Sequence, residues 1–280
     1  MEFLANLSLE PWQIGLVIVA GIAAGGINAV VGSGTLITFP ALVAFGVPPV
    51  VSTMSNAVGL IPGNIASSLG YREELRGQWK RILGFVPASL LGSLTGAYLL
   101  LHLPEDAFET IVPVLLVVAL IMVVGQPYLS RYLKNRSLRR AEAAGVEHRA
   151  ASVGDRLSTG RYIAVLIVVF LTAIYGGYFA AAQGIILIAL LGLLLPDDLQ
   201  RLNGLKNVLV LVVNTVSAST YIIVGHDRIN WIAVVCIAIG SMIGGYFGAR
   251  VGRKFSPVLL RAVIVVLGLV AIWRDRKSVV

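Results

Sequence analysis

Apolar runs of about 20 residues recur along the whole sequence, and this recurrence restricts the possible fold more than any other feature. A run of this length is enough for a helix to cross the hydrocarbon core of a bilayer. Hydrophobic residues make up 57% of the chain, charged residues 13%, and the mean hydropathy is +0.87, which lies outside the range of soluble domains. The sequence therefore predicts an all-α, polytopic membrane protein with about eight transmembrane helices. The expected spans are about residues 11–31, 48–70, 82–101, 108–127, 161–196, 200–224, 229–249 and 256–273.

Residues 25–64 are apolar, but glycine, proline and hydrogen-bonding residues interrupt them. Glycine allows backbone conformations that other residues avoid, and proline lacks the N–H that a helix interior needs. In a membrane, such irregular backbone is tolerated only where it is buried in protein or lines a water-filled cavity. The stretch therefore predicts a broken or re-entrant helix at a substrate site. Close packing of small residues between ordinary helices is the alternative.

A similarly broken run follows at residues 174–196, and the two halves of the chain match each other. Gly26 and Asn56 are as far apart as Gly177 and Asn207. Two interrupted apolar segments at corresponding places in two halves are the best indication that a sequence gives of a transporter binding site. We therefore expect two transmembrane repeats joined by a linker. The expected units are a first repeat at 1–130, a basic cytoplasmic linker at 131–160 and a second repeat at 161–280.

Positive charge sets the expected orientation. Eight of the 22 Lys and Arg residues lie within residues 131–161, and four more lie within residues 72–81. Cytoplasmic loops carry an excess of such residues, so both segments are expected to be cytoplasmic. Residues 137–150 are compatible with a surface helix or with a solvated linker. The repeats could be parallel or inverted, and we favour inverted repeats because broken paired segments commonly accompany them.

Several function classes have little support. Apart from Glu109, at the start of the span expected at 108–127, the apolar spans carry no Asp or Glu, which argues against cation transport and against a carboxylate proton relay. No HExxH, GxSxG, CxxC or P-loop motif occurs, so we expect no enzyme activity, no metal site and no cofactor. The formal charge of +8 lies mostly in loops, so it indicates topology and not nucleic-acid binding. Cys236 has no partner for a disulfide.

The remaining features suit a small anion. The N-termini of half-helices present free N–H groups and the positive end of the helix dipole. Lys206, beside Asn207, is one of the few basic residues at the edge of an apolar span. It could add charge to an anion path, or it could extend to the lipid headgroups.

The segments GGINAVVGSGTLITFPAL, PPVVSTMSNAVGLIPGNIASSLGYREEL and QG…LNGLKNVLVLVVN together resemble the sulfite exporter TauE/SafE family of membrane permeases. The resemblance covers about residues 11–273. It implies a multi-pass protein of the cell membrane, in bacteria the plasma membrane, that exports small sulfur-containing anions such as sulfite or organosulfonates. A homodimer is also implied.

The same resemblance implies which residues bind the substrate. They are Gly32, Ser33, Gly34, Thr35, Asn56, Gln183, Gly184, Lys206 and Asn207. The chain departs from the family pattern at residues 31–35 and 180–183, where more glycine is expected, and this leaves the substrate open. A permease for another small anion, such as a carboxylate, and a membrane scaffold without transport are the alternatives.

Overall fold

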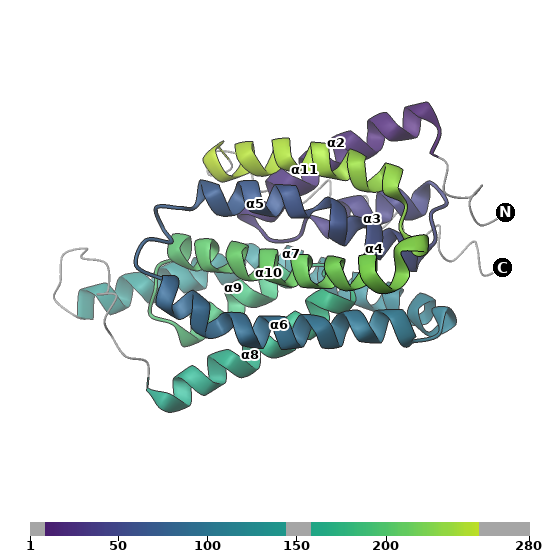
Figure 1. Cartoon of the computed structure of the whole chain (residues 1–280). Coiled ribbons are helices and arrows are strands. Elements are labelled where there is room, and N and C mark those ends of the chain that lie inside the picture. The colour runs from purple at the N-terminus through teal and green to yellow at the C-terminus, as the bar shows by residue number, and fades with distance from the viewer. Residues whose placement is uncertain (1–8, 144–157, 252–280) are drawn as a thin grey trace.

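The computed structural model describes residues 9–143 and 158–251, and within these ranges it is a bundle of helices with no strand (Figure 1). Six of its helices are long and apolar enough to cross a membrane. They are α2 (Pro11–Val30), α6 (Trp79–His102), α7 (Glu105–Ala143), α8 (Thr159–Tyr178), α10 (Leu199–Gly225) and α11 (Trp231–Val251). This architecture confirms the all-α membrane fold, while the span expected at 256–273 lies outside the described residues.

The span expected at 48–70 is divided into two helices, α4 (Pro49–Gly59) and α5 (Ile61–Gly70). The division falls at Leu60, one residue before the first turn of α5, which contains Pro62. Proline has no backbone N–H and its ring crowds the preceding turn, so an uninterrupted helix through Pro62 is disfavoured. Each part is too short to cross a bilayer alone, and together they cover the expected range.

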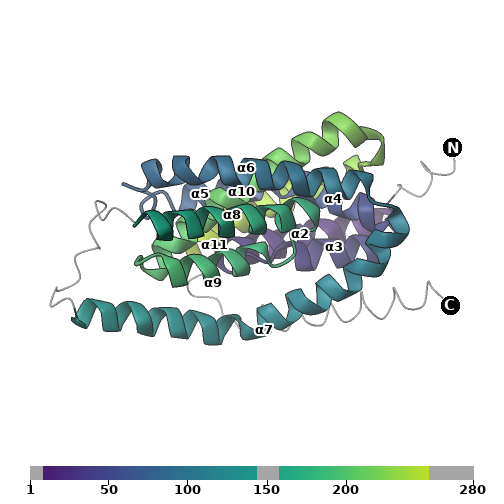
Figure 2. The ribbon, with the colours of Figure 1, turned by 90° about the horizontal axis from the view of Figure 1, so that it is seen from below.

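Helix α7 is longer than the expected fourth span. It has 39 residues and continues to Ala143, so the boundary expected at residue 130 falls inside a helix. Figure 2 shows α7 along one side of the bundle, extending beyond its neighbours. Part of the basic segment is therefore a continuation of a membrane helix, and residues 144–157 lie outside the described ranges.

Two helical hairpins enter the bundle from opposite ends. The first consists of α2 and the short helix α3 (Thr35–Ala44), and the second of α8 and the short helix α9 (Gln183–Leu194). In Figure 1, α2, α4, α7 and α11 begin at the right-hand end, whereas α6, α8 and α10 begin at the left-hand end. The tips of the two hairpins therefore point toward each other.

The long helices pair across the two halves of the chain. Helix α11 packs along α2, and α6 packs along α8. In both pairs glycines allow the two backbones to touch: Gly244 and Gly248 of α11 lie against Ile22 and Gly26, and Gly92 and Gly96 of α6 lie against Phe170 and Ile174. These are the close-packing contacts that GxxxG spacing indicates in membranes.

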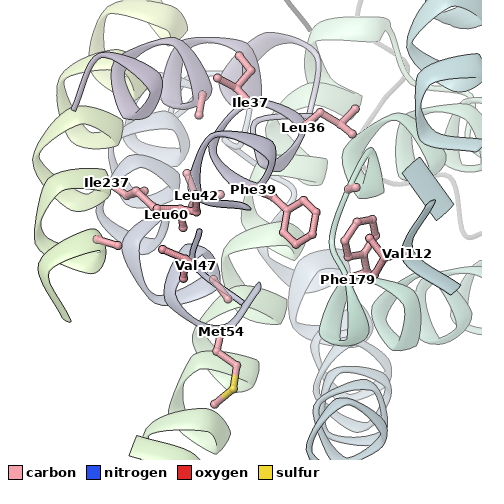
Figure 3. Close-up of a cluster of buried hydrophobic side chains, with 14 of the residues drawn as sticks. Leu36, Ile37, Phe39, Leu42, Val47, Met54, Leu60, Val112, Phe179 and Ile237 are labelled. Atoms are coloured by element: carbon pink, nitrogen blue, oxygen red, sulfur yellow. The ribbon is translucent and has the colours of Figure 1, made fainter. Parts of the chain in front are cut away.

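Aromatic side chains join the hairpins to α7. Phe39 of α3 packs edge-on against Phe179, which follows α8, with 5.1 Å between the ring centroids. Figure 3 shows these two rings beside Val112 of α7, within a larger cluster of buried apolar side chains. Phe108 of α7 also packs edge-on against Tyr178, at 5.4 Å. The tip of the second hairpin is thus held against both α3 and α7.

The two ends of the bundle differ in charge. Apart from Lys206 and Arg228, every Lys and Arg in the described ranges belongs to segments toward the left-hand end of Figure 1. Arg228 lies at the other end, in the short 3-10 helix η1 (His226–Arg228). Lys206 lies inside the bundle.

Candidate functional site

The first hairpin turns at residues 31–34. Helix α2 ends at Val30, and Gly32 follows with φ of +85°. The N–H groups of Val31 and Gly32 both donate to Ile27 O, at 2.7 and 3.2 Å. A glycine in the left-handed region is a common way to end a helix, because it has no Cβ to clash there. Helix α3 then begins at Thr35, with its N-terminus in the interior of the protein.

The second hairpin turns at residues 179–182 without glycine. Ala180 and Ala182 have φ of 63° and 59°, which is unfavourable for a residue with a Cβ. The Tyr175 hydroxyl donates to Ala181 O within this turn. Helix α9 begins at Gln183, so its N-terminus also lies in the interior. The sequence expectation of a break in each half is matched by two turns of different backbone chemistry.

The two turns meet backbone to backbone. Gly184 N–H donates to Gly32 O at 3.0 Å. A Cβ built at Gly32 would lie 2.5 Å from Gly184 Cα, and a Cβ at Gly184 would lie 2.5 Å from Gly32 Cα. Neither position can accept a side chain unless the turns move apart.

Lys206 lies beside this contact and is fully buried. Its Cδ is 3.2 Å from the Cβ position of Gly32 and 3.0 Å from that of Gly184. Its Nζ donates to Asn28 O at 3.0 Å and to Ala29 O at 3.4 Å. These are carbonyls of the last turn of α2, where a positive charge is favourable. The side chain therefore turns inward and does not extend to the membrane surface.

No carboxylate pairs with Lys206 in the described part of the chain. The ion pairs found there join Asp197 to Arg81 and Arg201, at the basic end of the bundle. Asn207 supports the same helix end as Lys206, because its Nδ2 donates to Ala29 O at 3.2 Å. The interior of the bundle thus contains one ammonium group whose acceptors are neutral carbonyls.

Amide groups connect the first turn to α5. Gly34 N–H donates to Asn28 Oδ1 at 3.4 Å, and Asn28 Nδ2 donates to Asn64 Oδ1 at 2.6 Å. A Cβ at Gly34 would lie 2.5 Å from Ala24 O, so this position needs glycine for packing, since its φ of −58° is ordinary. This connection through Asn28 was not predicted as part of the site.

Asn56 has different partners from Asn207. Its Oδ1 accepts from the Thr38 hydroxyl, and its Nδ2 donates to Thr35 Oγ1 at 3.1 Å. These bonds hold α4 to α3, and no hydrogen bond joins Asn56 to Asn207. The predicted pairing of the two amides across one site stays a prediction.

Ser33 and Gln183, one in each turn region, are buried with polar atoms that make no protein hydrogen bond. Their exposed fractions are 1% and 2%, and the unpartnered atoms are Ser33 Oγ and both amide atoms of Gln183. The Gln183 amide occupies space that Gly176 leaves free, because a Cβ at Gly176 would lie 2.5 Å from its Nε2. Buried polar groups normally have partners, so these atoms are candidates for ligand contact.

The structure thus brings Gly32, Gly184 and Lys206 into contact. Ser33 lies in the first turn, and Gln183 directly follows the second as the first residue of α9. Gly34, Thr35 and Asn56 form the adjoining contact between α2, α3 and α4. Sequence reasoning did not find Tyr221, whose hydroxyl donates to Gly177 O near the end of α8. The sequence signal for it is Tyr71, at the equivalent place in the first half, 150 positions earlier. The structure shows that both tyrosines are buried.

This fold, with apolar helices of membrane-spanning length and two hairpins that meet in the interior, defines a multi-pass membrane protein. The chain belongs to the sulfite exporter TauE/SafE family, whose model matches residues 17–274. This confirms the family resemblance seen in the sequence, and its relatives identify the class as membrane transporters.

Two relatives match over most of their length. The chain is 24% identical over 247 residues to a "Probable membrane transporter protein" of Haemophilus influenzae, which covers 88% of each chain. It is 21% identical over 263 residues to the "Probable membrane transporter protein YfcA" of Escherichia coli K12, covering 94% of this chain and 89% of the relative. A shorter match, 31% over 99 residues, is to the "Probable membrane transporter protein ORF9" of Sinorhizobium sp and covers 35% of this chain and 38% of the relative. No solved structure matches the chain.

Proposed function

We propose that this protein is a secondary transporter that exports small sulfur-containing anions, such as sulfite or organosulfonates, past the contact between Gly32 and Gly184. The observation that carries the proposal is Lys206, a buried cation without a carboxylate partner at the place where the two breaks meet. A buried charge is costly unless it is compensated. An anionic substrate supplies that compensation during its passage.

A charge estimate supports Lys206 as the source of anion preference. The N-termini of α3 and α9 each contribute roughly half a positive charge to the interior, and the C-termini of α2 and α8 each contribute roughly half a negative charge. These four ends lie at the two turns, so their contributions approximately cancel. The remaining charge is that of Lys206, which suits a small anion held by one cation and by neutral donors such as Ser33 and Gln183.

The family supports the choice of substrate. Its name refers to sulfite export. The names of the relatives say only that they are membrane transporters, so a carboxylate or another small anion is the first alternative to test. The described spans carry no Asp or Glu in their apolar parts, in agreement with a path that does not move cations.

We further propose that the halves are inverted repeats and that the basic end of the bundle is cytoplasmic. Helix α2 starts at one end and α8 at the other, and basic segments gather at the end where α8 starts. The positive-inside rule assigns this end to the cytoplasm. Gly248 lies against Gly26 as Gly96 lies against Gly177, which is the reciprocal contact that a two-fold relation produces.

The experiment is flux in proteoliposomes, with sulfite, methanesulfonate and acetate as anionic substrates and with taurine, a zwitterion near neutral pH, for comparison. With the cell interior negative, each exported negative charge gains about 2.3 kcal/mol per 100 mV, which sustains roughly a 50-fold gradient. We therefore expect sulfite flux to follow a potassium–valinomycin potential and to depend weakly on an imposed pH gradient. Flux of acetate alone would contradict a sulfur-containing substrate and would support a carboxylate permease. Flux that ignores the potential and follows the pH gradient would instead indicate proton coupling.

A further inference from the structure

One face of α10 carries polar residues along most of the helix. Asn203, Asn207, Asn214 and Ser217 are separated by four, seven and three positions, which places them on the same side of an α-helix. From Asn203 to Ser217 the face extends for about 21 Å, since a helix rises about 1.5 Å per residue. Lys206 adjoins this face, beside Asn207. We call these four residues the α10 polar face.

The α10 polar face is directed into the bundle. Its residues have exposed fractions of 5%, 4%, 3% and 1%, whereas Ser219, two positions after Ser217, is exposed. Helix α10 packs against α4, α5, α6, α8 and α9. The face therefore lies in the interior of the protein, and the side of α10 that carries Ser219 is turned away from it.

Three oxygen atoms of this face make no hydrogen bond to the protein. They are Asn203 Oδ1, Asn214 Oδ1 and Ser217 Oγ. A serine in an apolar helix can donate to the carbonyl four residues earlier. Ser219 and Thr220 do so, at 2.8 Å to Thr215 O and 2.9 Å to Val216 O, but Ser217 does not. The Ser217 hydroxyl is thus oriented differently from its neighbours on the same helix.

The corresponding face in the first half is better satisfied. Ser52 Oγ donates to Val47 O at 3.1 Å, Ser67 Oγ donates to Gly63 O at 2.8 Å, and Asn56 bonds to two threonines. Two other atoms of α5, Nδ2 of Asn64 and Oγ of Ser68, lack a protein partner. At the positions matched to Asn203, Asn214 and Ser217, the side-chain oxygens of the first half therefore all have a protein partner, whereas those three oxygens of α10 have none.

We infer that the α10 polar face lines the path of the substrate, and that a small oxyanion, with its water, passes from Lys206 along Asn214 and Ser217 toward the end of the bundle opposite the basic segments. The Ser217 hydroxyl can donate to the anion, and the Oδ1 atoms of Asn203 and Asn214 can accept from the water that accompanies it. These contacts carry no fixed charge that would hold the anion. The inference rests on the proposed transport function and adds the route and its neutral contacts. The alternative is that these polar groups only pack between helices.

Cysteine accessibility tests the route. In a Cys236→Ala background, which removes the single native thiol, Ser217→Cys and Ser219→Cys are matched variants on opposite sides of one helix. The probe is methanethiosulfonate ethylsulfonate, a small sulfonate that modifies thiols in water, applied to both sides of proteoliposomes. We expect Ser217→Cys to react at least ten times faster than Ser219→Cys, and methanesulfonate, a sulfonate that does not consume the reagent, to slow its reaction. Equal rates, or no reaction at Ser217→Cys, would overturn the inference.

Two further readouts separate the route from the substrate. Rapid labelling of Ser217→Cys that methanesulfonate does not slow supports the route and counts against small sulfonates as the substrate. If Ser217→Cys does not insert, the flux of Ser217→Ala and Ser219→Ala decides. A several-fold loss in Ser217→Ala alone supports the route, and unchanged flux in both variants contradicts it.

Discussion

The two breaks of this protein have similar geometry and different chemistry. Each joins a membrane helix to a short helix whose N-terminus lies in the interior. The first turn uses Gly32 at positive φ, whereas the second uses Ala180 and Ala182 there. The carbonyls at the end of α2 accept from Lys206 and Asn207, while Gly177 and Ala181 in the second break accept from tyrosine hydroxyls.

The two turns therefore differ in backbone strain and in the charge beside them. The first turn has an unstrained backbone, and the helix end before it accepts hydrogen bonds from the charged Lys206. The second turn is neutral, and it is held in an unfavourable backbone conformation by its surroundings, including the Phe39–Phe179 contact. A related pair of segments can thus keep one shape while only one of them contacts a buried ammonium group.

The largest effect is expected from a side chain at the contact between the turns. Gly32→Ala combines positive φ with a clash against Gly184, so we expect transport to be abolished while the protein still inserts. Gly46→Ala is the matched control, because Gly46 has φ of +88° and nothing within 4 Å of its Cβ position. Loss of flux in both variants would assign the effect to backbone strain alone. Proteoliposome flux with a check of insertion measures this.

Gly34→Val tests the first turn at a position whose φ of −58° is favourable for any residue. The Cβ clashes with Ala24 O of α2, so we expect α3 to be displaced and flux to be lost. Gly125→Val in α7 is the control, because no atom lies within 4 Å of its Cβ position. Normal flux from correctly inserted Gly34→Val would show that the first turn does not need close packing.

Removal of the buried charge is expected to have the next largest effect. Lys206→Gln should lower sulfite flux about 10- to 100-fold, from the loss of hydrogen bonds made by a charged group, and Lys206→Arg should keep part of the activity. Tyr221→Phe removes a neutral donor from the second break, and we expect a smaller loss. If Lys206→Gln transports as well as the parent protein, Lys206 is only a cap for α2.

Substitutions of Asn56 and Asn207 test whether neutral amide groups near the two breaks bind the substrate. Asn56→Leu removes the amide that bonds to the Thr35 and Thr38 hydroxyls, of which Thr38 keeps a bond to Gly34 O at 3.4 Å. Asn207→Leu leaves the acceptor Ala29 O with one donor fewer. If both amides also contact the substrate, each change should weaken anion binding by about 1–3 kcal/mol. Direct binding measurements check this, and affinities equal to that of the parent would show that both amides only pack.

The smallest effect is expected at the strained turn. Ala182→Gly removes an unfavourable left-handed alanine, worth about 1 kcal/mol, against a glycine entropy cost of about 0.5–1 kcal/mol. We expect a small rise in the thermal unfolding midpoint in detergent, with flux unchanged. Ala181→Gly is the control, since Ala181 has no positive φ and should only lose stability. A loss of flux in Ala182→Gly alone would show that the rigidity of this turn is needed for transport.

The sequence predicted both breaks because glycine, proline and polar residues are unusual inside apolar runs. It also predicted Lys206 as a candidate substrate-binding residue. The direction of its side chain was open, because the α2 carbonyls that it contacts lie 177 and 178 positions away in the sequence. The positive φ of Ala180 and Ala182 could not be predicted, since alanine normally avoids that region. The full length of α7 was not predicted, because the basic residues 131–143 were interpreted as a linker, whereas they continue its helix.

One irregularity of the expected repeat has a structural explanation. Asn56 and Asn207 are 151 positions apart, whereas Asn64 and Asn214 are 150 apart, so the first half has one additional residue between its two asparagines. That segment contains Leu60, where α4 ends and α5 begins. The second half has a continuous helix, α10, at the corresponding place. A helix interruption thus accounts for a shift that sequence spacing alone left unexplained.

Helix α2 packs against α11 and α6 against α8, so each pair joins the two halves of the chain. This has a consequence for biosynthesis. When the ribosome has completed α6, the glycine surfaces of α2 and α6 are in the bilayer, but the helices that cover them have not been synthesised. Helix α8 covers α6 first, and α11 later covers α2 and also contacts α5 through Gly63 and Gly245. Neither half can therefore complete its helix packing before the other is inserted. The glycine surface of α2, in the first hairpin, stays uncovered until α11 is inserted.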